Sequence, residues 1–227
     1  MRTAAPVRSP SLGHVKTWVF DMDNTLYSPR VNLFAQIDRR MEAYVGRLLG
    51  LPPEEARAVQ KRYFHEHGTT LRGLMLSHGV DPHDFLSFVH DIDFSVLSPD
   101  PRLRQALLRL PGRRFVFTNG DRPYALKVLG ALGVEDCFDG LFDIHAMAYH
   151  PKPDPRAYRE LLDTFDIRPD SALMVDDMAY NLRPAKALGM TTVWLDNGSE
   201  RGAFGHGPEF VDYEATELAD FLERVVA

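Results

Sequence analysis

Two aspartates that lie two residues apart, Asp21 and Asp23, follow directly on a short apolar stretch of the sequence. The carboxylate of Asp21, first after that stretch, could attack phosphorus and form an aspartyl-phosphate. Asp23 could reach the leaving oxygen, donate a proton to the departing alcohol, and then act as a base on the attacking water. This pair of carboxylates predicts hydrolysis of a phosphate monoester.

Two carboxylates next to an anionic ester would repel it, so the same chemistry predicts a cation as cofactor. Mg²⁺ takes oxygen ligands, usually one or two carboxylates together with water and substrate phosphate. Asp177, in a second acidic cluster, is expected to bind this ion together with Asp21. Asp176 is expected to lie behind these ligands, or to be a weaker candidate ligand itself.

Three adjacent residues and one lysine are candidates for contacting the phosphate group. Thr118 offers a hydroxyl, and the backbone N–H groups of Asn119 and Gly120 could surround phosphate oxygens near a helix start. Lys152 lies between two prolines, which stiffen its loop. Its ammonium could pair with Asp21 in the resting protein and with the phosphate in the transition state.

Each of these clusters has a simpler explanation when it is taken alone. Acidic residues after a strand often cap the next helix, Asn-Gly is a common turn, and most lysines are solvated. The functional interpretation therefore depends on all four clusters meeting at one place, which is decided by the elements that carry them.

The hydrophobic pattern predicts strands and helices in alternation over most of the chain. We expect strands at residues 15–20, 113–117, 141–144, 172–175 and 191–195, helices at residues 103–110, 123–132, 155–165, 181–188 and 217–226, and a loop at residues 197–209. Such alternation predicts an α/β fold with parallel strands and crossover helices. Ligands of such sheets bind beyond the carboxyl ends of the strands. All four clusters lie at predicted strand ends or in the loops just beyond them.

One long stretch interrupts this alternation. Helical periodicity and helix-ending residues predict helices at residues 31–50, 52–67, 71–78 and 83–90, with no strand among them. We therefore divide the chain into an α/β core, residues 15–29 and 99–227, and a helical insertion, residues 30–98. Residues 1–14 are polar and lack the apolar middle of a signal peptide, and they are predicted to be a disordered tail.

In their order along the chain, the four clusters resemble the motifs of the haloacid dehalogenase-like hydrolase superfamily. The matching positions are the Asp-x-Asp-x-Thr run at residues 21–25, Thr118, Lys152, and the pair Asp176 and Asp177. The resemblance covers residues 15–198. It implies a doubly wound, Rossmann-like parallel sheet with a helical cap inserted after the first strand. It also implies a magnesium ion that contacts the backbone carbonyl of Asp23.

Within that superfamily, the chain is most similar to pyrimidine 5′-nucleotidases of the yeast suppressor type. The shared patterns are Phe-Asp-x-Asp-x-x-Leu-Tyr at residues 20–27, a cap pattern at Tyr63, Gly68 and residues 72–74, the run at residues 138–141, and Asn181 after the second acidic pair. This resemblance implies UMP, CMP or a similar small nucleotide as the substrate. It places Arg72 on the phosphate side and Asn181 behind the metal ligands.

Two positions depart from that pattern. Many relatives have serine where this chain has Met178, and the change is expected to alter hydrogen bonds near the metal. Pro184 falls inside the predicted helix at residues 181–188, where a proline should kink the helix or shorten it. Neither position removes a reacting group.

Composition argues against several other classes of protein. The formal net charge of the 227 residues is −6, which gives no basic surface for nucleic acid and no polybasic patch for a membrane. No apolar run approaches the length of a membrane span. The single cysteine, Cys137, suits a reducing compartment, so we expect a cytoplasmic protein. The nine histidines lack partners at metal-ligand spacing and do not predict zinc. The sequence indicates no oligomeric state.

Other activities stay open for the same fold. The alternatives are a phosphatase or phosphomutase of another small ester such as a sugar phosphate, a metal-independent 2-haloacid dehalogenase, and a phosphate-binding module without catalysis. A dehalogenase uses a carboxylate nucleophile but needs neither Mg²⁺ nor a second aspartate, so Asp23 and Asp177 argue against it. The presence of every reacting group argues against a silent module.

Overall fold

A six-stranded parallel sheet forms the centre of the larger part of the molecule. The computed structural model describes residues 12–200 and 202–226. The strands are β1 (Thr17–Phe20), β2 (Arg113–Phe117), β3 (Gly140–Phe142), β4 (Ala172–Asp176), β5 (Thr191–Leu195) and β6 (Tyr213–Ala215). Their order across the sheet is β3-β2-β1-β4-β5-β6, and every neighbouring pair is parallel. The predicted doubly wound α/β fold is confirmed.

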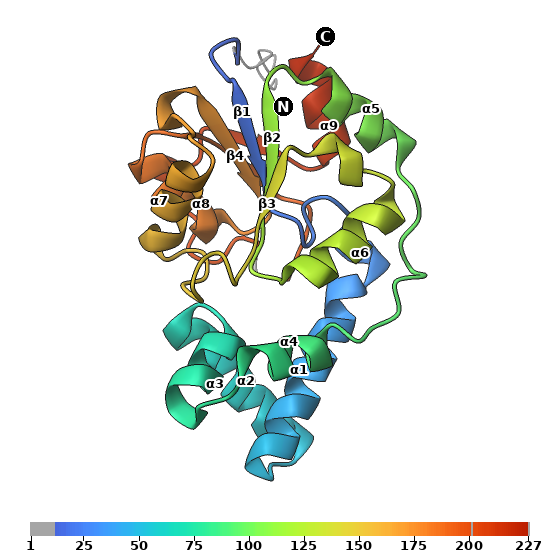
Figure 1. Ribbon diagram of the computed structural model, residues 1–227, viewed down its shortest axis with the longest axis vertical. Coiled ribbons are helices and arrows are strands. Elements are labelled where there is room, and N and C mark those ends of the chain that lie inside the picture. Colours follow the sequence, from blue (N-terminus) through green and yellow to red (C-terminus); the bar gives the residue numbers. More distant parts are fainter. Residues whose placement is uncertain (1–11, 201, 227) are drawn as a thin grey trace, which may run out of the picture.

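Helices cover both faces of this sheet, as Figure 1 shows. One face carries α7 (Pro155–Thr164) and α8 (Ala179–Ala187), and the other carries α5 (Pro101–Arg109), α6 (Arg122–Leu132) and α9 (Leu218–Val225). Short 3₁₀ helices lie at Pro29–Val31, Glu135–Cys137, Pro169–Ser171 and Pro208–Phe210. Successive side chains of a strand point to opposite faces. Accordingly, Trp18 and Phe20 of β1 pack into one apolar cluster and Val19 into the other.

The strand β6 is absent from the sequence prediction. Its three residues include the exposed Glu214, so they lack the apolar pattern that indicates a strand. Pairing with β5, where Tyr213 lies opposite Val193, gives this segment its extended conformation. Edge strands are often very short, and here a tertiary contact decides the local structure.

The core includes a residue from the predicted tail. Residues 1–11 of that tail lie outside the described residues. Leu12 belongs to an apolar core cluster and is 5% exposed. The N–H of Val15 donates to the carbonyl of Leu12 at 2.9 Å, which closes a turn in front of β1. Leu12 therefore packs with the core in a buried turn that precedes the first strand.

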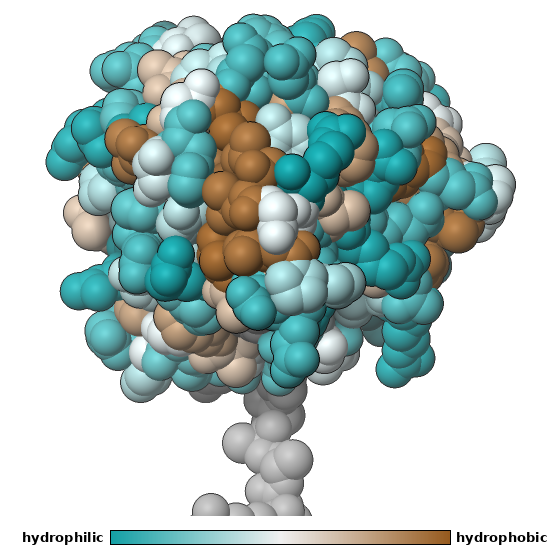
Figure 2. All heavy atoms as spheres, turned by 90° about the horizontal axis from the view of Figure 1, so that it is seen from below, coloured by the Kyte–Doolittle hydropathy of each residue, from teal (hydrophilic) through white to brown (hydrophobic). Residues whose placement is uncertain are grey.

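Four helices form a separate layer below the core in Figure 1. They are α1 (Leu33–Leu49), α2 (Pro53–His67), α3 (Thr70–His78) and α4 (Pro82–Val89), and we call them the cap. The chain leaves the core after β1 and returns at α5, so the predicted helical insertion after the first strand is confirmed. Seen from this end, the surface is mostly hydrophilic, with a strip of apolar side chains near its middle and smaller apolar patches toward its sides (Figure 2). In the described part of the chain, no helix is long and apolar enough to cross a membrane.

Two glycines set how α2, α3 and the core meet. A β-carbon on Gly73 would lie 2.4 Å from Cγ of the buried Tyr63, so the two helices pack closely only without a side chain there. Gly68 ends α2 at a φ of 83°, and a β-carbon there would lie 3.4 Å from Cγ of Pro151 in the core. Glycine adopts such a φ without strain. The spacing of Tyr63, Gly68 and Gly73 in the sequence thus has a packing reason.

Replacing Gly73 with alanine is expected to destabilise the protein by about 1–3 kcal/mol, the usual cost of overpacking a core. The new methyl group would overlap the ring of Tyr63. Urea unfolding followed by circular dichroism measures the change. Gly130→Ala is the matched control, since the nearest atom to a β-carbon there is Glu135 Oε2 at 3.8 Å. The control should keep its stability or gain up to about 1 kcal/mol, and equal losses in both variants would contradict this packing.

Candidate active site

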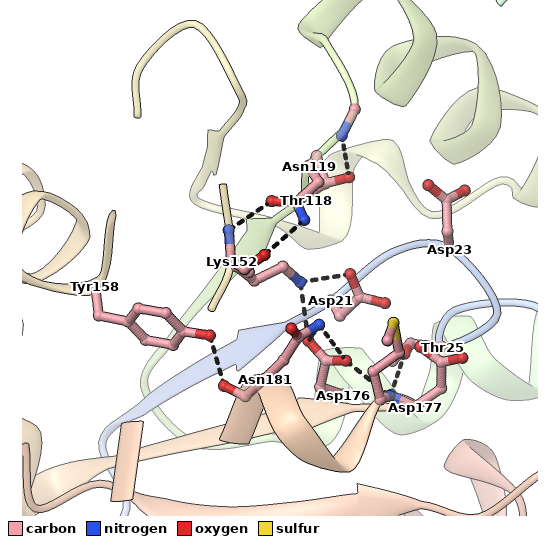
Figure 3. Close-up of polar contacts among 12 residues, drawn as sticks. Asp21, Asp23, Thr25, Thr118, Asn119, Lys152, Tyr158, Asp176, Asp177 and Asn181 are labelled. Atoms are coloured by element: carbon pink, nitrogen blue, oxygen red, sulfur yellow. Dashed lines mark hydrogen bonds and ion pairs between the residues drawn. The ribbon is translucent and has the colours of Figure 1, made fainter. Parts of the chain in front are cut away.

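The order of the strands brings the four polar clusters together. Asp21 follows β1, Thr118 follows β2, and Asp177 follows β4. Because β1 lies between β2 and β4, the carboxyl ends of these three strands are neighbours. Lys152 reaches the same place from the loop between β3 and α7 (Figure 3). Side chains that are far apart in the sequence therefore share one site at the predicted edge of the sheet.

The ammonium of Lys152 lies between two carboxylates. Its Nζ donates to Asp21 Oδ1 at 2.6 Å and to Asp176 Oδ2 at 2.9 Å, and its side chain is 1% exposed. Burial lowers the pKa of Lys152, but the charges and hydrogen bonds of Asp176 and Asp21 raise it more, so that this pKa lies above its ordinary value. Lys152 is therefore charged at neutral pH, and it fixes the orientation of Asp21.

The side chain of Asn119 holds the backbone of Lys152. Its Oδ1 accepts the Lys152 N–H at 2.8 Å, and its Nδ2 donates to the Lys152 carbonyl at 3.2 Å. The next peptide bond, between Lys152 and Pro153, is cis. The sequence predicts only a backbone contact with phosphate for Asn119. The reciprocal pair of hydrogen bonds could not be predicted, because no local pattern links positions 119 and 152.

Asp176 receives hydrogen bonds on both of its carboxylate oxygens. Oδ1 accepts from the Met178 N–H at 2.9 Å and from Asn181 Nδ2 at 3.0 Å, while Oδ2 accepts from Lys152 at 2.9 Å. The carbonyl of Asn181 in turn accepts from Tyr158 Oη at 2.5 Å. These contacts fit the expected role of Asp176 and Asn181 as supports for the reacting groups.

Asp177 is anchored through its main chain. Its N–H donates to Thr25 Oγ1 at 3.0 Å, and its carbonyl accepts from Trp194 Nε1 at 2.9 Å. Thr25 thereby joins the loop after β1 to the loop after β4. Burial and the charges of Asp21 and Asp176 raise the pKa of the Asp177 carboxyl well above its ordinary value. The carboxylate of Asp177 is thus held among like charges, and a nearby cation would relieve them.

The three buried acids fit a divalent metal ion. Ligand oxygens of Asp21, Asp176 and Asp177 all lie within 4.8 Å of one another. Lys152 brings one positive charge against three carboxylates, so a cation of higher charge is needed to balance them. Carboxylate oxygens are the ligands that Mg²⁺ prefers in proteins. Because donors already occupy both oxygens of Asp176, Asp21 and Asp177 are better placed to bind the ion.

Thr118 and Gly120 form a tight turn after β2. Thr118 is buried, and its Oγ1 accepts the Gly120 N–H at 3.0 Å. A β-carbon on Gly120 would lie 2.8 Å from Cδ1 of Tyr124, so the turn packs on α6 only with glycine at this position. The Gly120 N–H that the sequence predicts as a phosphate contact is therefore engaged within the turn. A phosphate oxygen would share this N–H with Thr118 Oγ1.

Asp23 is held by two tyrosines. Tyr27 Oη donates to Asp23 Oδ1 at 2.6 Å, and Tyr124 Oη donates to the same oxygen at 2.5 Å. Burial and the charge of Asp21 raise the pKa of Asp23 above its ordinary value, although both hydrogen bonds act in the opposite direction. In Figure 3 the Asp23 side chain lies apart from the Lys152 ion pairs. A carboxyl group with a raised pKa suits proton donation.

Sequence analysis does not identify these two tyrosines as site residues. Tyr27 belongs to the run at residues 20–27 that carries the family resemblance, so its position gave a usable signal. Tyr124 gave none, because an aromatic residue in the first turn of an amphipathic helix is ordinarily a core residue. It is indeed buried in the core, and only its hydroxyl reaches the site.

A cavity of about 190 Å³ lies between the cap and these acids. From the core it is lined by Asp21, Asp23, Asn119, Gly120, Lys152 and Asp177, among others. From the cap it is lined by the apolar residues Phe34, Ile37, Met41, Phe64, Leu71, Phe85, Leu86 and Val89, and by polar residues that include Asp38, Gln60 and Lys61. A substrate whose phosphate group reaches Asp21 would therefore place its leaving group against the cap. We call this space the leaving-group cavity.

Arg72 does not line the leaving-group cavity. It lies on α3, is partly exposed, and lines a neighbouring cavity of about 430 Å³ beside Pro151 and Pro153. Asn119 and Lys152 line both cavities. Among the predicted site residues, Arg72 is thus the one that the structure sets apart from the aspartates.

The two departures from the family pattern are accommodated. Met178 contacts Asp176 through its N–H, which any residue except proline supplies, and the rest of Met178 borders the leaving-group cavity. The helix α8 runs from Ala179 to Ala187 with Pro184 inside it, so the proline does not end the helix. The helix begins at Ala179 rather than at residue 181, and it continues beyond the proline.

Comparison with known families agrees with this site. Residues 15–189 match the family described as haloacid dehalogenase-like hydrolases. The match covers most of the chain and contains every motif position named above. The chain belongs to this family.

Several curated relatives are phosphatases. The chain is 28% identical over 197 residues to phosphate metabolism protein 8 of Saccharomyces cerevisiae, covering 77% of the chain and 60% of that protein. It is 30% identical over 138 residues to glyceraldehyde 3-phosphate phosphatase of Pyrococcus furiosus, covering 59% of the chain and 57% of that protein. It is 28% identical over 207 residues to phosphoglycolate phosphatase of Rhodospirillum rubrum, covering 82% and 81%. None of these three is named as a nucleotidase, so they do not support the pyrimidine branch.

Solved structures with a similar fold include enzymes of both chemistries. A phosphatase of this family from Thermococcus onnurineus has a TM-score of 0.62 at 20% identity, covering 94% of the chain and 98% of that structure. An L-2-haloacid dehalogenase from Xanthobacter autotrophicus has a TM-score of 0.58 at 20% identity, covering 93% and 98%. Likeness at this identity concerns the fold alone. The choice between the two chemistries therefore depends on the site.

Asp177→Asn is expected to stabilise the metal-free protein at neutral pH. Because folding raises the pKa of Asp177 above its ordinary value of 3.8, the folded protein binds more protons than the unfolded chain above that pH. Stability therefore falls as the pH rises through the raised pKa. The variant does not lose this stability. Its excess free energy of unfolding over the native protein should therefore shrink as the pH is lowered toward 3.8, the ordinary pKa of an aspartate. Urea unfolding in EDTA measures the difference, with Asp163→Asn, exposed on α7, as the control.

Added Mg²⁺ separates this electrostatic effect from metal binding. We expect Mg²⁺ to raise the Tm of the native protein and of Asp163→Asn, because a ligand that binds only the folded state stabilises it. The Tm of Asp177→Asn should not respond. An equal rise in all three proteins would exclude Asp177 as a metal ligand.

Proposed function

We propose that the protein is a Mg²⁺-dependent phosphatase that hydrolyses a small phosphate monoester through an aspartyl-phosphate on Asp21. The observation that carries this proposal is the arrangement around Asp21. Lys152 Nζ lies 2.6 Å from Asp21 Oδ1, one carboxylate oxygen of Asp177 lies within 4.8 Å of one of Asp21, and Asp23 lines the same cavity. The proposed nucleophile, the cation site and the proposed proton donor therefore all border the leaving-group cavity.

Asp21 is the attacking group in this scheme. Lys152 keeps its carboxylate oriented, and offers a positive charge to the phosphate as negative charge shifts during transfer. A bound Mg²⁺, held by Asp21, Asp177 and the backbone carbonyl of Asp23, would neutralise phosphate charge that otherwise repels the nucleophile. The P–O bond to Asp21 forms while the bond to the leaving oxygen breaks.

Asp23 handles the proton. In its protonated form it donates to the leaving oxygen, and as a carboxylate it then takes a proton from the water that attacks the aspartyl-phosphate. Its raised pKa favours the protonated form that the first step needs. Thr118 and the N–H groups of Asn119 and Gly120 orient the phosphate oxygens.

The acids of the site, together with the relatives described above, support a phosphatase over a dehalogenase. Two of these relatives are named as phosphatases, one of glyceraldehyde 3-phosphate and one of phosphoglycolate. A dehalogenase needs neither a cation site nor a second aspartate, whereas Asp177 and Asp23 are both present beside Asp21. A small sugar phosphate or a similar small ester is therefore the first substrate class to consider.

A specific observation keeps pyrimidine nucleoside 5′-monophosphates as the second candidate. Gln60 is 1% exposed and lines the leaving-group cavity. Its Nε2 donates to Asp38 Oδ1 at 2.7 Å, but its Oε1 has no hydrogen-bond partner among the described residues. A buried acceptor without a donor is costly. The N–H or O–H group of a nucleoside could satisfy it, while the apolar wall of the cap would cover the base.

The first test is phosphate release from sugar phosphates, phosphoglycolate, UMP and CMP, with Mg²⁺ and with EDTA. We expect release that requires Mg²⁺ and that falls to background in Asp21→Asn, because the carboxamide is not a nucleophile. Asp163→Asn should keep full activity. The proposal is lost if the metal-loaded native protein releases phosphate from none of these esters, or if chloride release from 2-haloacids proceeds without metal.

The second test addresses the leaving group. If a nucleoside binds in the cavity, Gln60→Leu should raise KM for UMP about 5- to 10-fold, the value of one buried hydrogen bond. It should leave KM for phosphoglycolate unchanged, because the glycolate group carries no N–H or O–H that could donate to Gln60 Oε1. Gln105→Leu, exposed on α5, is the control. An unchanged KM for UMP, or faster turnover of the sugar phosphates, would remove the nucleotide candidate.

A further inference from the structure

The carboxyl group of Asp23 is held by hydrogen bonds from two different elements. Tyr27, just after β1, and Tyr124, on α6, both donate to Oδ1, at 2.6 and 2.5 Å. A carboxyl oxygen that accepts two hydrogen bonds has both lone pairs engaged, so the proton of the acid belongs on Oδ2. The two phenols therefore decide which oxygen of Asp23 can serve as the donor.

Tyr124 is itself fixed on several sides. It is buried, and its N–H donates to Asp121 Oδ1 at 3.1 Å in the first turn of α6. The imidazole of His90 stacks on its ring, with centroids 4.2 Å apart and planes inclined by 13°. Gly120 leaves room for the ring on the side of the phosphate turn. The hydroxyl of Tyr124 is thus aimed at Asp23 by the packing of its ring.

His90 reaches this place from the cap. It is the residue that ends α4, and its Nδ1 lies 2.9 Å from Asp121 Oδ1. The side chains of His90 and Asp121 are only 11% and 12% exposed. The same oxygen of Asp121 therefore contacts the cap and caps the helix that carries Tyr124. His90, Asp121 and Tyr124 form a continuous path of contacts from the cap to Asp23.

We propose that His90 is a positioning residue for the proton donor, because its contacts with Asp121 and Tyr124 keep the Tyr124 hydroxyl on Asp23. This inference rests on the proposed function, since it assigns Asp23 the proton of the leaving group. Correct placement of the acid then depends on the cap being docked on the core. Protonation of the leaving oxygen is efficient only while the cap covers the cavity.

A purely structural role for His90 would have a different kinetic result. Losing a cap contact alone would slow the hydrolysis of every substrate alike. Losing the placement of the acid slows only substrates whose leaving oxygen needs a proton, as an alkoxide does and p-nitrophenolate does not. The value of kcat/KM reports transfer to Asp21 and not the later hydrolysis of the aspartyl-phosphate. The ratio of kcat/KM for an alkyl phosphate to kcat/KM for p-nitrophenyl phosphate therefore measures the contribution of the general acid alone.

The experiment compares p-nitrophenyl phosphate with the best alkyl phosphate of the phosphate-release screen. We expect His90→Ala and Tyr124→Phe to lower kcat/KM for the alkyl phosphate about 10-fold or more, part of the usual contribution of a general acid. For p-nitrophenyl phosphate the loss should be below about 3-fold, since little general-acid contribution is at stake. Tyr124→Phe keeps the ring that His90 stacks on and removes only the hydroxyl. The double variant should be no worse than Tyr124→Phe, because His90 acts through that hydroxyl.

His78→Ala is the matched control. His78 also ends a cap helix and contacts a tyrosine, with Nε2 2.7 Å from Tyr63 Oη, but both residues belong to the cap. It should leave the substrate ratio unchanged. Should circular dichroism show that His90→Ala is unfolded, Asp121→Asn takes its place, since it weakens the same contact from the core side.

Two kinds of failure are distinguishable. Equal losses on both substrates in His90→Ala, or no loss on the alkyl phosphate, would overturn the positioning role and leave the phosphatase intact. A native protein that cleaves p-nitrophenyl phosphate but no alkyl phosphate would also overturn it, because Asp23 would then protonate no alkoxide. A native protein that cleaves neither substrate would overturn the proposed function, and this inference with it.

Discussion

A buried ammonium between two carboxylates is the interaction on which the site depends. Lys152 contacts Asp21 and Asp176 with its side chain almost fully removed from water. Burying such charges is costly unless each is paired and hydrogen-bonded. Asn181 adds a hydrogen bond to the charged Asp176, and Asn119 holds the backbone of Lys152 in place. Asp21, the proposed nucleophile, is therefore oriented before any substrate arrives.

The same arrangement leaves negative charge in excess. Three carboxylates crowd one edge of the sheet, and burial together with the charges of Asp21 and Asp176 raises the pKa of Asp177. Sites of this kind commonly sacrifice stability for function. Here the excess charge is also what gives the site affinity for a divalent cation, so the local instability and the expected cofactor have one cause.

The cap and the core divide the work. The core supplies the reacting groups, and its fold resembles those of phosphatases and a dehalogenase alike. The cap supplies the apolar wall of the cavity, and its helices pack closely through Gly73 against Tyr63. At His90 the two parts meet beside Tyr124, so the cap that lines the cavity also touches the residues that hold Asp23, the proposed proton donor.

The sequence by itself determined the class of fold and predicted which side chains would gather at one edge of the sheet. Alternating apolar and helical patterns are local, and Asp21, Asp23, Thr118, Lys152 and Asp177 each follow a predicted strand or lie in the loop beyond one. Because parallel strands end at a common edge, those positions were enough to predict that the residues share that edge. The strand order places β1 between β2 and β4, and so brings their ends next to one another.

Only the tertiary structure decided how these groups are held. Tyr124, Asn119 and His90 act through partners that lie 101, 33 and 31 positions away, and no local pattern records such pairings. Strand β6 depends in the same way on its neighbour β5. The sequence predicts Arg72 on the phosphate side, but its position on a helix does not say which cavity its side chain lines, and it lines the neighbouring one. Neighbouring residues decide whether a segment forms a helix or a strand. The orientation of a buried side chain depends instead on the residues that the fold packs against it.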